Sequence, residues 1–271
     1  MERQSIPKEI NGNYALITGA CKGIGRAMAC ECASKGMNML LVSDDQVALD
    51  QLMQDLCQWY EVDSRVFCID LAKKQAPLKV FEWVMENAFP INVLINNVGI
   101  GKSGTFSKME IKDANYMITL NNRVFTELTY HFLKLLQQQP KAYILNMSSI
   151  EATLPLPYKA VYTGTKNFVY AFSLALREEL KPTKVSVSVI CPGPVLTNAD
   201  GLGRMNAHGK RSKLLLMMPG QVAKIAIDGM LKGKSVIVPG YLNAFFFWVG
   251  SKLPRSIKMP LLEKLFRVYK T

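Results

Sequence analysis

Short, continuous apolar runs alternate along the chain with stretches in which apolar residues recur at helical spacing. Continuous runs such as Tyr14-Ala-Leu-Ile-Thr18 are typical of strands that are buried on both faces of a parallel sheet. We predict seven strands, at 14–18, 39–43, 65–70, 91–96, 141–147, 184–190 and 235–239. Helices are predicted between them, at 25–35, around 49–56 and 80–85, and over about 161–180.

This order of elements predicts an α/β fold, a doubly wound parallel sheet with helices on both faces. Ligands in such folds bind beyond the carboxyl ends of the strands, so the functional residues are expected there. No repeat, low-complexity segment or linker marks a second unit, and we therefore expect one domain over residues 1–271.

Composition narrows the class of protein. Of the 271 residues, 49% are hydrophobic and 20% are charged, which argues against intrinsic disorder. No apolar run approaches the roughly 20 residues that cross a bilayer, and the N-terminus shows no secretory signal. The 2 histidines and the 6 cysteines lack the spacing of a zinc site, so we expect no metal and buried, reduced thiols. A cytoplasmic location is expected.

Charge is concentrated near the C-terminus. From residue 201 onward, thirteen Lys and Arg face two acidic residues, and this segment carries nearly all of the net charge of +12. A solvated face would explain such a block, and so would an anionic partner such as a phosphate-bearing carrier, an acidic protein or a membrane surface. No recognised motif supports nucleic-acid binding, and we predict none.

A glycine-rich turn, Thr18-Gly-Ala-Cys-Lys-Gly-Ile-Gly25, joins the first strand to the first helix. Its glycines allow a sharp turn and a close approach of the backbone to a pyrophosphate. The helix N-terminus adds free N–H groups and the positive end of the helix dipole, so we predict a dinucleotide phosphate site. The predicted contacts in the turn are Gly19, Cys21, Lys22, Gly23, Ile24 and Gly25.

The end of the second strand bears on the choice between NAD and NADP. An acid there binds the ribose hydroxyls, whereas a base accommodates the extra 2′-phosphate. Ser43 and Asp44 occupy this place, and the carboxylates of Asp44 and Asp45 would repel a phosphate, whereas Lys22 would attract it. We expect NAD or NADP as cofactor, with a slight preference for NAD.

A phenol and an ammonium stand four residues apart near the start of the long predicted helix. At this spacing Tyr162 and Lys166 lie on one helix face. A free tyrosine has a pKa of about 10, and a neighbouring cation lowers that pKa toward the range useful for proton transfer. Ser149, which follows the fifth strand, could polarise a carbonyl, although Ser148 and Ser149 also suit turns or helix caps.

These motifs, in this order, resemble the short-chain dehydrogenase/reductase family over nearly the whole chain. The resemblance rests on the turn at 18–25, Asn96-Asn-Val-Gly99, the Ser149, Tyr162 and Lys166 set, and Pro192-Gly-Pro-Val-Leu-Thr197. It implies a Rossmann-like, NAD(P)-binding domain.

The resemblance also implies catalytic roles. Tyr162 would be the general acid in reduction and the general base in oxidation, and Lys166 would lower its pKa and bind the nicotinamide ribose. Ser149 would polarise the carbonyl. Asn121 would hold a water that relays protons; Asn122 is the alternative, and the spacing to the following helix favours Asn121.

Further cofactor contacts follow from the same resemblance. Asp70 and Leu71 would contact the adenine, Asn96 would lie beside the adenosine ribose, and the segment from Pro192 would cover the nicotinamide. The remaining expected contacts are Val98, Gly99, Pro192, Gly193, Val195 and Thr197. Members specific for NADP often carry arginine at the place of Asp44, and those specific for NAD usually carry an acid at the place of Ser43, so this chain matches neither pattern.

Two segments suggest where the substrate binds. Residues at about 197–219 form the expected substrate lid, and a basic and apolar C-terminal extension covers about 241–271. Mixed aromatic and cationic segments of this kind can lie in a bilayer interface, cover a subunit contact or close the substrate cleft. We expect a hydrophobic substrate, a homodimer or homotetramer, and possible peripheral contact of the extension with an anionic membrane.

The expected function is hydride transfer between NAD(P) and a carbonyl/alcohol group of a steroid-, acyl- or lipid-like substrate. One alternative is a 3-oxoacyl-thioester reductase of fatty-acid or lipid metabolism. The other is a non-catalytic module that senses nucleotides or binds a lipid surface. Turnover that disappears in Tyr162→Phe would separate the enzyme from the module.

Overall fold

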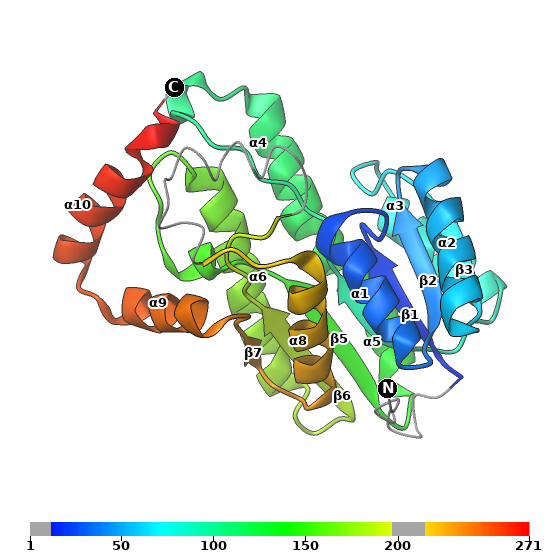
Figure 1. The fold of residues 1–271 in the computed structure, drawn as a ribbon. Coiled ribbons are helices and arrows are strands. Elements are labelled where there is room, and N and C mark those ends of the chain that lie inside the picture. Colours follow the sequence, from blue (N-terminus) through cyan, green and yellow to red (C-terminus); the bar gives the residue numbers. More distant parts are fainter. Residues whose placement is uncertain (1–11, 197–214, 271) are drawn as a thin grey trace.

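The structure is a computed structural model that describes residues 12–196 and 215–270. Parallel strands form one seven-stranded sheet in the order β3-β2-β1-β4-β5-β6-β7, which confirms the doubly wound fold (Figure 1). The strands are β1 (Tyr14–Thr18), β2 (Asn38–Ser43), β3 (Ser64–Cys68), β4 (Ile91–Asn96), β5 (Ala142–Met147), β6 (Val185–Ile190) and β7 (Val236–Ile237).

Helices and short helical turns connect these strands. The α-helices are α1 (Gly23–Ser34), α2 (Gln46–Tyr60), α3 (Ala76–Glu86), α4 (Ile111–Ile118), α5 (Val124–Gln137), α6 (Ala160–Glu179), α8 (Pro219–Leu231), α9 (Tyr241–Lys252) and α10 (Arg255–Phe266). The short turns are the 3₁₀ turns η2 (Phe106–Lys108), η4 (Ile150–Thr153) and η6 (Arg267–Tyr269) and the π-turn η3 (Thr119–Arg123).

Both faces of the sheet are covered because successive strand residues point to opposite sides. On one face, α1, α2 and α8 pack on buried strand residues such as Ala15 and Ile17. On the other face, α3, α5 and the C-terminal half of α6 pack on residues such as Leu16 and Leu94. A strand buried on both sides needs apolar residues at every position, which is why its sequence shows no alternation.

Two strands end earlier than the sequence pattern predicts. β3 ends at Cys68 because the Asp70 carboxylate accepts a hydrogen bond of 2.9 Å from the Ala72 N–H and starts a turn. β7 consists of Val236 and Ile237, which pair with Val189 and Ile190 of β6. Proline at 239 has no N–H with which to extend this ladder.

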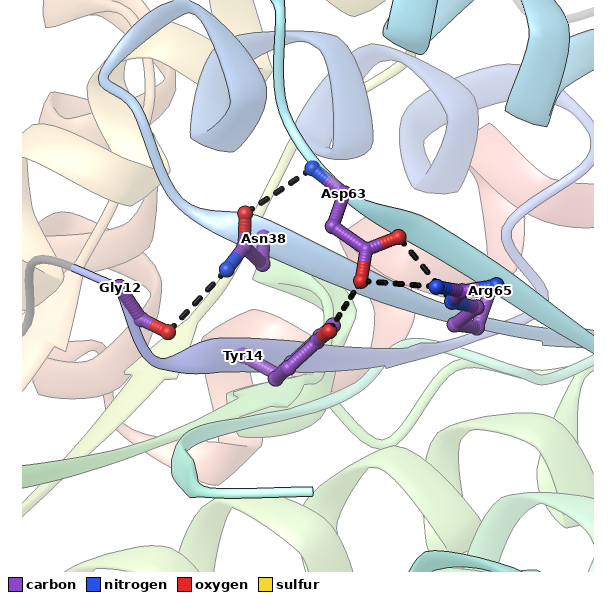
Figure 2. Close-up of polar contacts among 5 residues, drawn as sticks. All are labelled: Gly12, Tyr14, Asn38, Asp63 and Arg65. Carbon is purple, nitrogen blue, oxygen red and sulfur yellow. Dashed lines mark hydrogen bonds and ion pairs between the residues drawn. The ribbon is translucent and has the colours of Figure 1, made fainter. Parts of the chain in front are cut away.

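A polar cluster ties together the starts of β1, β2 and β3, at the edge opposite the predicted site (Figure 2). The Tyr14 hydroxyl donates a hydrogen bond to the Asp63 carboxylate, which also pairs with Arg65 at 3.0 Å. The Asn38 side chain accepts from the Asp63 N–H at 3.0 Å and donates to the Gly12 carbonyl at 3.1 Å. These bonds satisfy main-chain groups that the sheet leaves open, so we assign the cluster a structural role.

The thiols are free, but the expectation that they are buried is only partly right. Cys21, Cys32 and Cys191 are buried and Cys30 is half-buried, whereas Cys57 and Cys68 are exposed. Cys57 lies on the outer side of α2, and Cys68 ends β3, the edge strand of the sheet.

The basic, apolar C-terminal extension folds into α9, α10 and η6. These helices lie at one end of the molecule, and α2 and β3 lie at the other (Figure 1). Within the described ranges, no helix combines the length and apolar character that crossing a membrane requires.

Candidate active site

The glycine turn is closed tightly against the start of α1. Gly19 and Gly23 have φ angles of +64° and +55°, which favour glycine over residues with side chains. A Cβ atom on Gly25 would lie 2.5 Å from Asn97 Nδ2 and would overlap the Gly19 carbonyl oxygen even more severely. Asn97 Nδ2 donates to the carbonyls of Thr18 at 2.9 Å and Gly19 at 3.1 Å, so this amide holds the turn in shape.

The N-terminus of α1 is open to an anion. Lys22 occupies the cap position without a capping hydrogen bond from its side chain, and the first turn contains no acidic residue. Neither Lys22 nor the first turn itself therefore supplies a side-chain acceptor for the N–H groups at this helix end, which suits the binding of a phosphate there. Cys21 faces inward, with its thiol 3.6 Å from the Asp45 carbonyl, and the side chain of Ile24 packs against the core.

Lys22 does not stand alone beside the turn. Its ammonium lies 2.9 Å from the Asp45 carboxylate, which also accepts from the Ala48 N–H at 3.1 Å and caps α2. The hydrogen bond with Lys22 lowers the pKa of the Asp45 carboxyl and raises that of the Lys22 ammonium. Of the two carboxylates expected to repel a 2′-phosphate, Asp45 is thus already paired with a cation.

A hollow of mixed charge lies beyond β2 and β3. Asp44 and Asp70 line it together with Lys73, Lys74 and Lys79. The Ser43 hydroxyl donates to the Asp44 carboxylate at 3.3 Å and so orients it. These side chains lie where the adenosine end of a dinucleotide is expected.

Leu71 is placed differently from this expectation. Its side chain is 3% exposed and packs in the core with residues of α3. Contact with an adenine ring by this side chain would need the loop to open, so Leu71 acts as a core residue in this conformation.

The Asn96 side chain lies in the core behind the site. Asn96 is fully buried, and its Nδ2 donates to Thr129 Oγ1 at 3.1 Å and to Asn146 Oδ1 at 2.9 Å. Asn146 Nδ2 in turn donates to Ser173 Oγ at 2.9 Å, so a chain of polar groups crosses the core behind the site. The Asn96 side chain is part of this buried network, and its place beside the adenosine ribose stays a prediction. Its neighbour Asn97 is the residue that shapes the glycine turn.

Lys166 lies at the centre of the site and is almost entirely buried. Its Nζ donates to the Met147 carbonyl at 3.1 Å, and the Ser148 hydroxyl donates to the Lys166 carbonyl at 2.8 Å. Burial lowers the pKa of the Lys166 ammonium to about 8, and the neighbouring Cys191 opposes this shift. Burial raises the pKa of the Cys191 thiol to about 12.

Asn121 lies in the π-turn between α4 and α5 and faces Lys166. Its amide bonds both main-chain groups of Ile100 at 2.9 Å and donates to Thr165 Oγ1 at 2.9 Å. A Cβ atom on Gly99 would lie 2.8 Å from Asn121 Oδ1 and 3.3 Å from Lys166 Nζ, so the two side chains meet at this glycine. Asn122 instead donates to the Thr165 carbonyl, and the geometry therefore favours Asn121.

The Tyr162 ring lies between two ammonium groups. Its centroid is 6.0 Å from Lys166 Nζ and 5.9 Å from Lys159 Nζ, and Lys159 also pairs with Glu151 at 2.8 Å. A Cβ atom on Gly101 would lie 2.9 Å from the ring, so this glycine makes room for it.

Ser149 follows β5 on the same edge of the sheet. It caps η4, where its hydroxyl accepts from the Glu151 N–H at 3.1 Å. The hydroxyl hydrogen is not used in that bond and can be donated to a substrate oxygen.

The segment that starts at Pro192 runs beside η4 and is held by α9. The Pro192 carbonyl accepts from the Ile150 N–H at 3.0 Å, and Val195 pairs with Met217. A Cβ atom on Gly193 would lie 2.5 Å from Oδ1 of Asn243, a buried residue of α9. Thr197 and most of the expected lid, 197–214, lie outside the described residues.

Comparison with known proteins decides the family. The model of the short chain dehydrogenase family matches residues 13–205. The chain belongs to the short-chain dehydrogenase family. This short-chain dehydrogenase is 36% identical over 186 residues to the very-long-chain 3-oxoacyl-CoA reductase of Eremothecium gossypii, covering 66% of the chain and 53% of that relative.

Two further similarities extend over more of the chain. The very-long-chain 3-oxoacyl-CoA reductase of Anas platyrhynchos is 30% identical over 257 residues, which are 93% of this chain and 80% of the relative. A solved short-chain dehydrogenase from Sphingobium yanoikuyae, in complex with NADPH, superposes with a TM-score of 0.75 at 27% identity. That similarity covers 90% of this short-chain dehydrogenase and 97% of the other chain.

Three residues of the site escape the sequence pattern: Asn97, Lys159 and Asn243. Asn97 stands next to a residue of identical type, Lys159 is one of many lysines, and Asn243 lies far along the chain in the extension. Only Asn97 carried a usable signal, because alternation along a strand places Asn96 and Asn97 on opposite sides.

Burial of the Lys166 ammonium makes the stability of this short-chain dehydrogenase depend on pH. Its pKa is about 8 in the folded protein against an ordinary value of 10.5, so the unfolded chain binds more protons between these two pH values and stability rises with pH there. At a pH below the folded-state pKa of about 8, replacing Lys166 with methionine should add up to about 3 kcal/mol to the free energy of unfolding. Chemical denaturation of both proteins across this pH range checks the prediction. A stability gain that does not shrink as the pH rises toward 10.5 would contradict it.

Proposed function

We propose that this short-chain dehydrogenase transfers a hydride between a nicotinamide cofactor and a carbonyl/alcohol pair of a hydrophobic substrate. The observation that carries the proposal is the meeting of Asn121 and the buried Lys166 at Gly99, with Tyr162 one helical turn before Lys166. This group and the glycine turn both lie at the carboxyl ends of the strands, where the fold binds ligands.

The residues divide the chemistry between them. The cofactor, when bound, supplies the hydride for reduction and accepts it in oxidation. In reduction, the Tyr162 hydroxyl gives its proton to the carbonyl oxygen, and Ser149 donates a hydrogen bond to the same oxygen. Lys166 supplies the positive charge that stabilises the resulting phenolate, and Asn121 holds the backbone at Ile100 against α6.

The described residues fit a dinucleotide along this edge. The uncapped N-terminus of α1 suits the pyrophosphate, and the hollow beyond β2 suits the adenosine. The NADPH complex of the Sphingobium yanoikuyae relative supports a nicotinamide dinucleotide as the cofactor. Lysines at 73, 74 and 79 share the hollow with Asp44 and Asp70, so the choice between NAD and NADP depends on the balance of these charges.

Asp44 is an exposed acid in the hollow where a 2′-phosphate is expected. Its removal should shift the preference between NAD and NADP. Replacing Asp44 with asparagine should raise affinity for NADPH relative to NADH about tenfold, because a carboxylate charge near a phosphate costs on the order of 1 kcal/mol after screening. Asp50→Asn on α2 removes the same charge at a distance and serves as control. Fluorescence titration with both cofactors measures the ratio, and equal shifts in the two variants would contradict the prediction.

We propose a 3-oxoacyl thioester or a related hydrophobic ketone as the substrate. The names of the Eremothecium gossypii and Anas platyrhynchos relatives support this class, although the chain spans only 53% of the first of them. Oxidation of NADH or NADPH with a panel of aliphatic ketones, steroid ketones and 3-oxoacyl thioesters tests it, with Tyr162→Phe as the inactive control. Bound cofactor with no turnover of any member would favour the non-catalytic module.

We also propose a homodimer that forms through α5 and α6. Tyr130 on α5 is 77% exposed, and Phe168 on α6 is 43% exposed and stacks on Phe172. Exposed aromatic side chains are enriched in the contacts between subunits, and here both α5 and α6 carry them. Sedimentation of the protein and of Tyr130→Glu tests this assembly, and a monomer at all concentrations would overturn it.

A further inference from the structure

The outer faces of α9 and α10 are apolar. Ile257, Leu261 and Leu265 of α10 recur at helical spacing and form one exposed stripe, which Val268 of η6 continues, whereas Leu262 is buried. α9 exposes a second set of large side chains, which are Tyr241, Leu242, Phe245, Phe246 and Trp248. Large apolar side chains gathered on an exposed surface are typical of an interaction site, and these have no cover within the described chain.

Cations accompany this apolar surface. The exposed residues of the two helices and the following turn include Lys252, Arg255, Lys264, Arg267 and Lys270. Glu263 is the one acidic side chain between 241 and 270, and Arg267 pairs with it at 2.6 Å. Long cationic side chains beside aromatic and aliphatic groups match a surface that has anionic headgroups above hydrocarbon.

The inner face of the same helices joins the catalytic region. The Tyr158 hydroxyl donates to the Glu263 carboxylate at 3.0 Å, just before α6. Lys159 Nζ lies 5.3 Å from the Phe266 ring centroid and 5.0 Å from that of Tyr269. The same ammonium faces Tyr162, so α10 and η6 are anchored beside the catalytic tyrosine.

We propose that α9 and α10 dock on an anionic lipid bilayer and hold the active-site entrance against it, so that a hydrophobic substrate enters from the membrane. The entry of substrate from the membrane rests on the proposed function, whereas the docking itself does not depend on turnover. The arm formed by α9 and α10 lies at the end of the molecule farthest from α2, as a docking element should (Figure 1).

Charge favours a bilayer over a second copy of the chain on this surface. Two copies meeting face to face would bring like cations together, whereas anionic headgroups would neutralise them. A bilayer also accepts apolar side chains that point outward from two helices in sequence, without needing a complementary groove.

The docking experiment measures co-sedimentation with vesicles of phosphatidylcholine, with and without phosphatidylglycerol. The test variant is Trp248→Glu with Leu261→Glu, and the matched control is Val47→Glu with Met85→Glu, which adds the same charge at exposed positions of α2 and α3. The unchanged protein and the control should bind the anionic vesicles, and the test variant should bind at least about tenfold more weakly.

A second measurement addresses substrate entry. With anionic vesicles present, the test variant should show a raised KM for a long-chain ketone dissolved in the bilayer and an unchanged kcat/KM for a short, water-soluble ketone. An equal effect on both ketones would overturn delivery from the membrane. Binding to vesicles without turnover of either ketone would instead remove the proposed function and leave the docking intact.

Other outcomes decide against the bilayer. Equal binding by test and control variants would show that the arm does not dock. A test variant that keeps its lipid binding but sediments as a smaller particle would show that a second copy covers the surface.

Discussion

Replacing Tyr162 with phenylalanine should lower the turnover of ketones by a factor of about a hundred to ten thousand, which is the range for loss of a positioned proton donor. Phenylalanine keeps the ring, so the packing against Gly101 and the place between Lys159 and Lys166 are retained. Only the proton that balances the transferred hydride is lost. Steady-state oxidation of NADH or NADPH at saturating cofactor measures the effect.

The matched control for this variant lies two turns further along the same helix. Tyr170→Phe removes a hydroxyl from a ring that packs edge-on to Phe247 of α9, outside the catalytic group. It should leave turnover within a few-fold of the parent. Cofactor affinity should be unchanged in both variants, and a Tyr162→Phe protein that keeps its rate would exclude Tyr162 as the proton donor.

Adding a single methyl group at Gly25 should abolish tight cofactor binding. The new Cβ atom of Gly25→Ala would overlap the Gly19 carbonyl and lie 2.5 Å from Asn97 Nδ2, so the turn has to open or α1 has to move. Overpacking of this kind typically costs about 1–3 kcal/mol of stability. We expect a loss of affinity for NADH and NADPH of at least about a hundredfold, because the turn would no longer present its N–H groups to the phosphates.

Gly220→Ala provides the control for helix glycines, because a Cβ atom at Gly220 of α8 would have nothing within 4 Å. Its cofactor affinity should equal that of the parent. Its stability should rise slightly, since alanine loses less backbone entropy than glycine on folding. Calorimetric titration and thermal unfolding measure both quantities, and normal cofactor affinity in Gly25→Ala would show that the turn tolerates the extra atom.

The apolar pattern was sufficient to predict the sheet because parallel strands bury both faces and leave a continuous signal. Helices outside the βα repeat were not predicted from it. α9 has apolar side chains on both its inner and outer sides, and α10 exposes its apolar stripe and contains Pro260, so neither sequence shows the usual pattern of a helix with one buried apolar face. The π-turn at Asn121 depends on long-range bonds to Ile100 and Thr165, which a local pattern does not contain.

The site was predictable where spacing along one element sets the geometry, as for Tyr162 and Lys166 on α6. It was not predictable where the partner comes from a distant segment. Lys159 becomes a neighbour of Tyr162 within one helix, but Phe266 and Tyr269 reach it from the extension. The buried partners of the Asn96 side chain were not predictable from the motif, because a motif gives residue types, whereas the direction of a strand side chain follows from alternation.

The buried bond between Asn96 and Asn146 has a consequence for how precisely the reaction centre is assembled. These two residues are direct register partners on β4 and β5, and their side chains are joined at 2.9 Å. Sliding one strand past the other by a residue would displace the two side chains by about 3.3 Å and break this buried bond. The bond therefore fixes the register of β4 and β5, and with it the relative positions of Gly99 and Ser149, which follow the ends of these two strands.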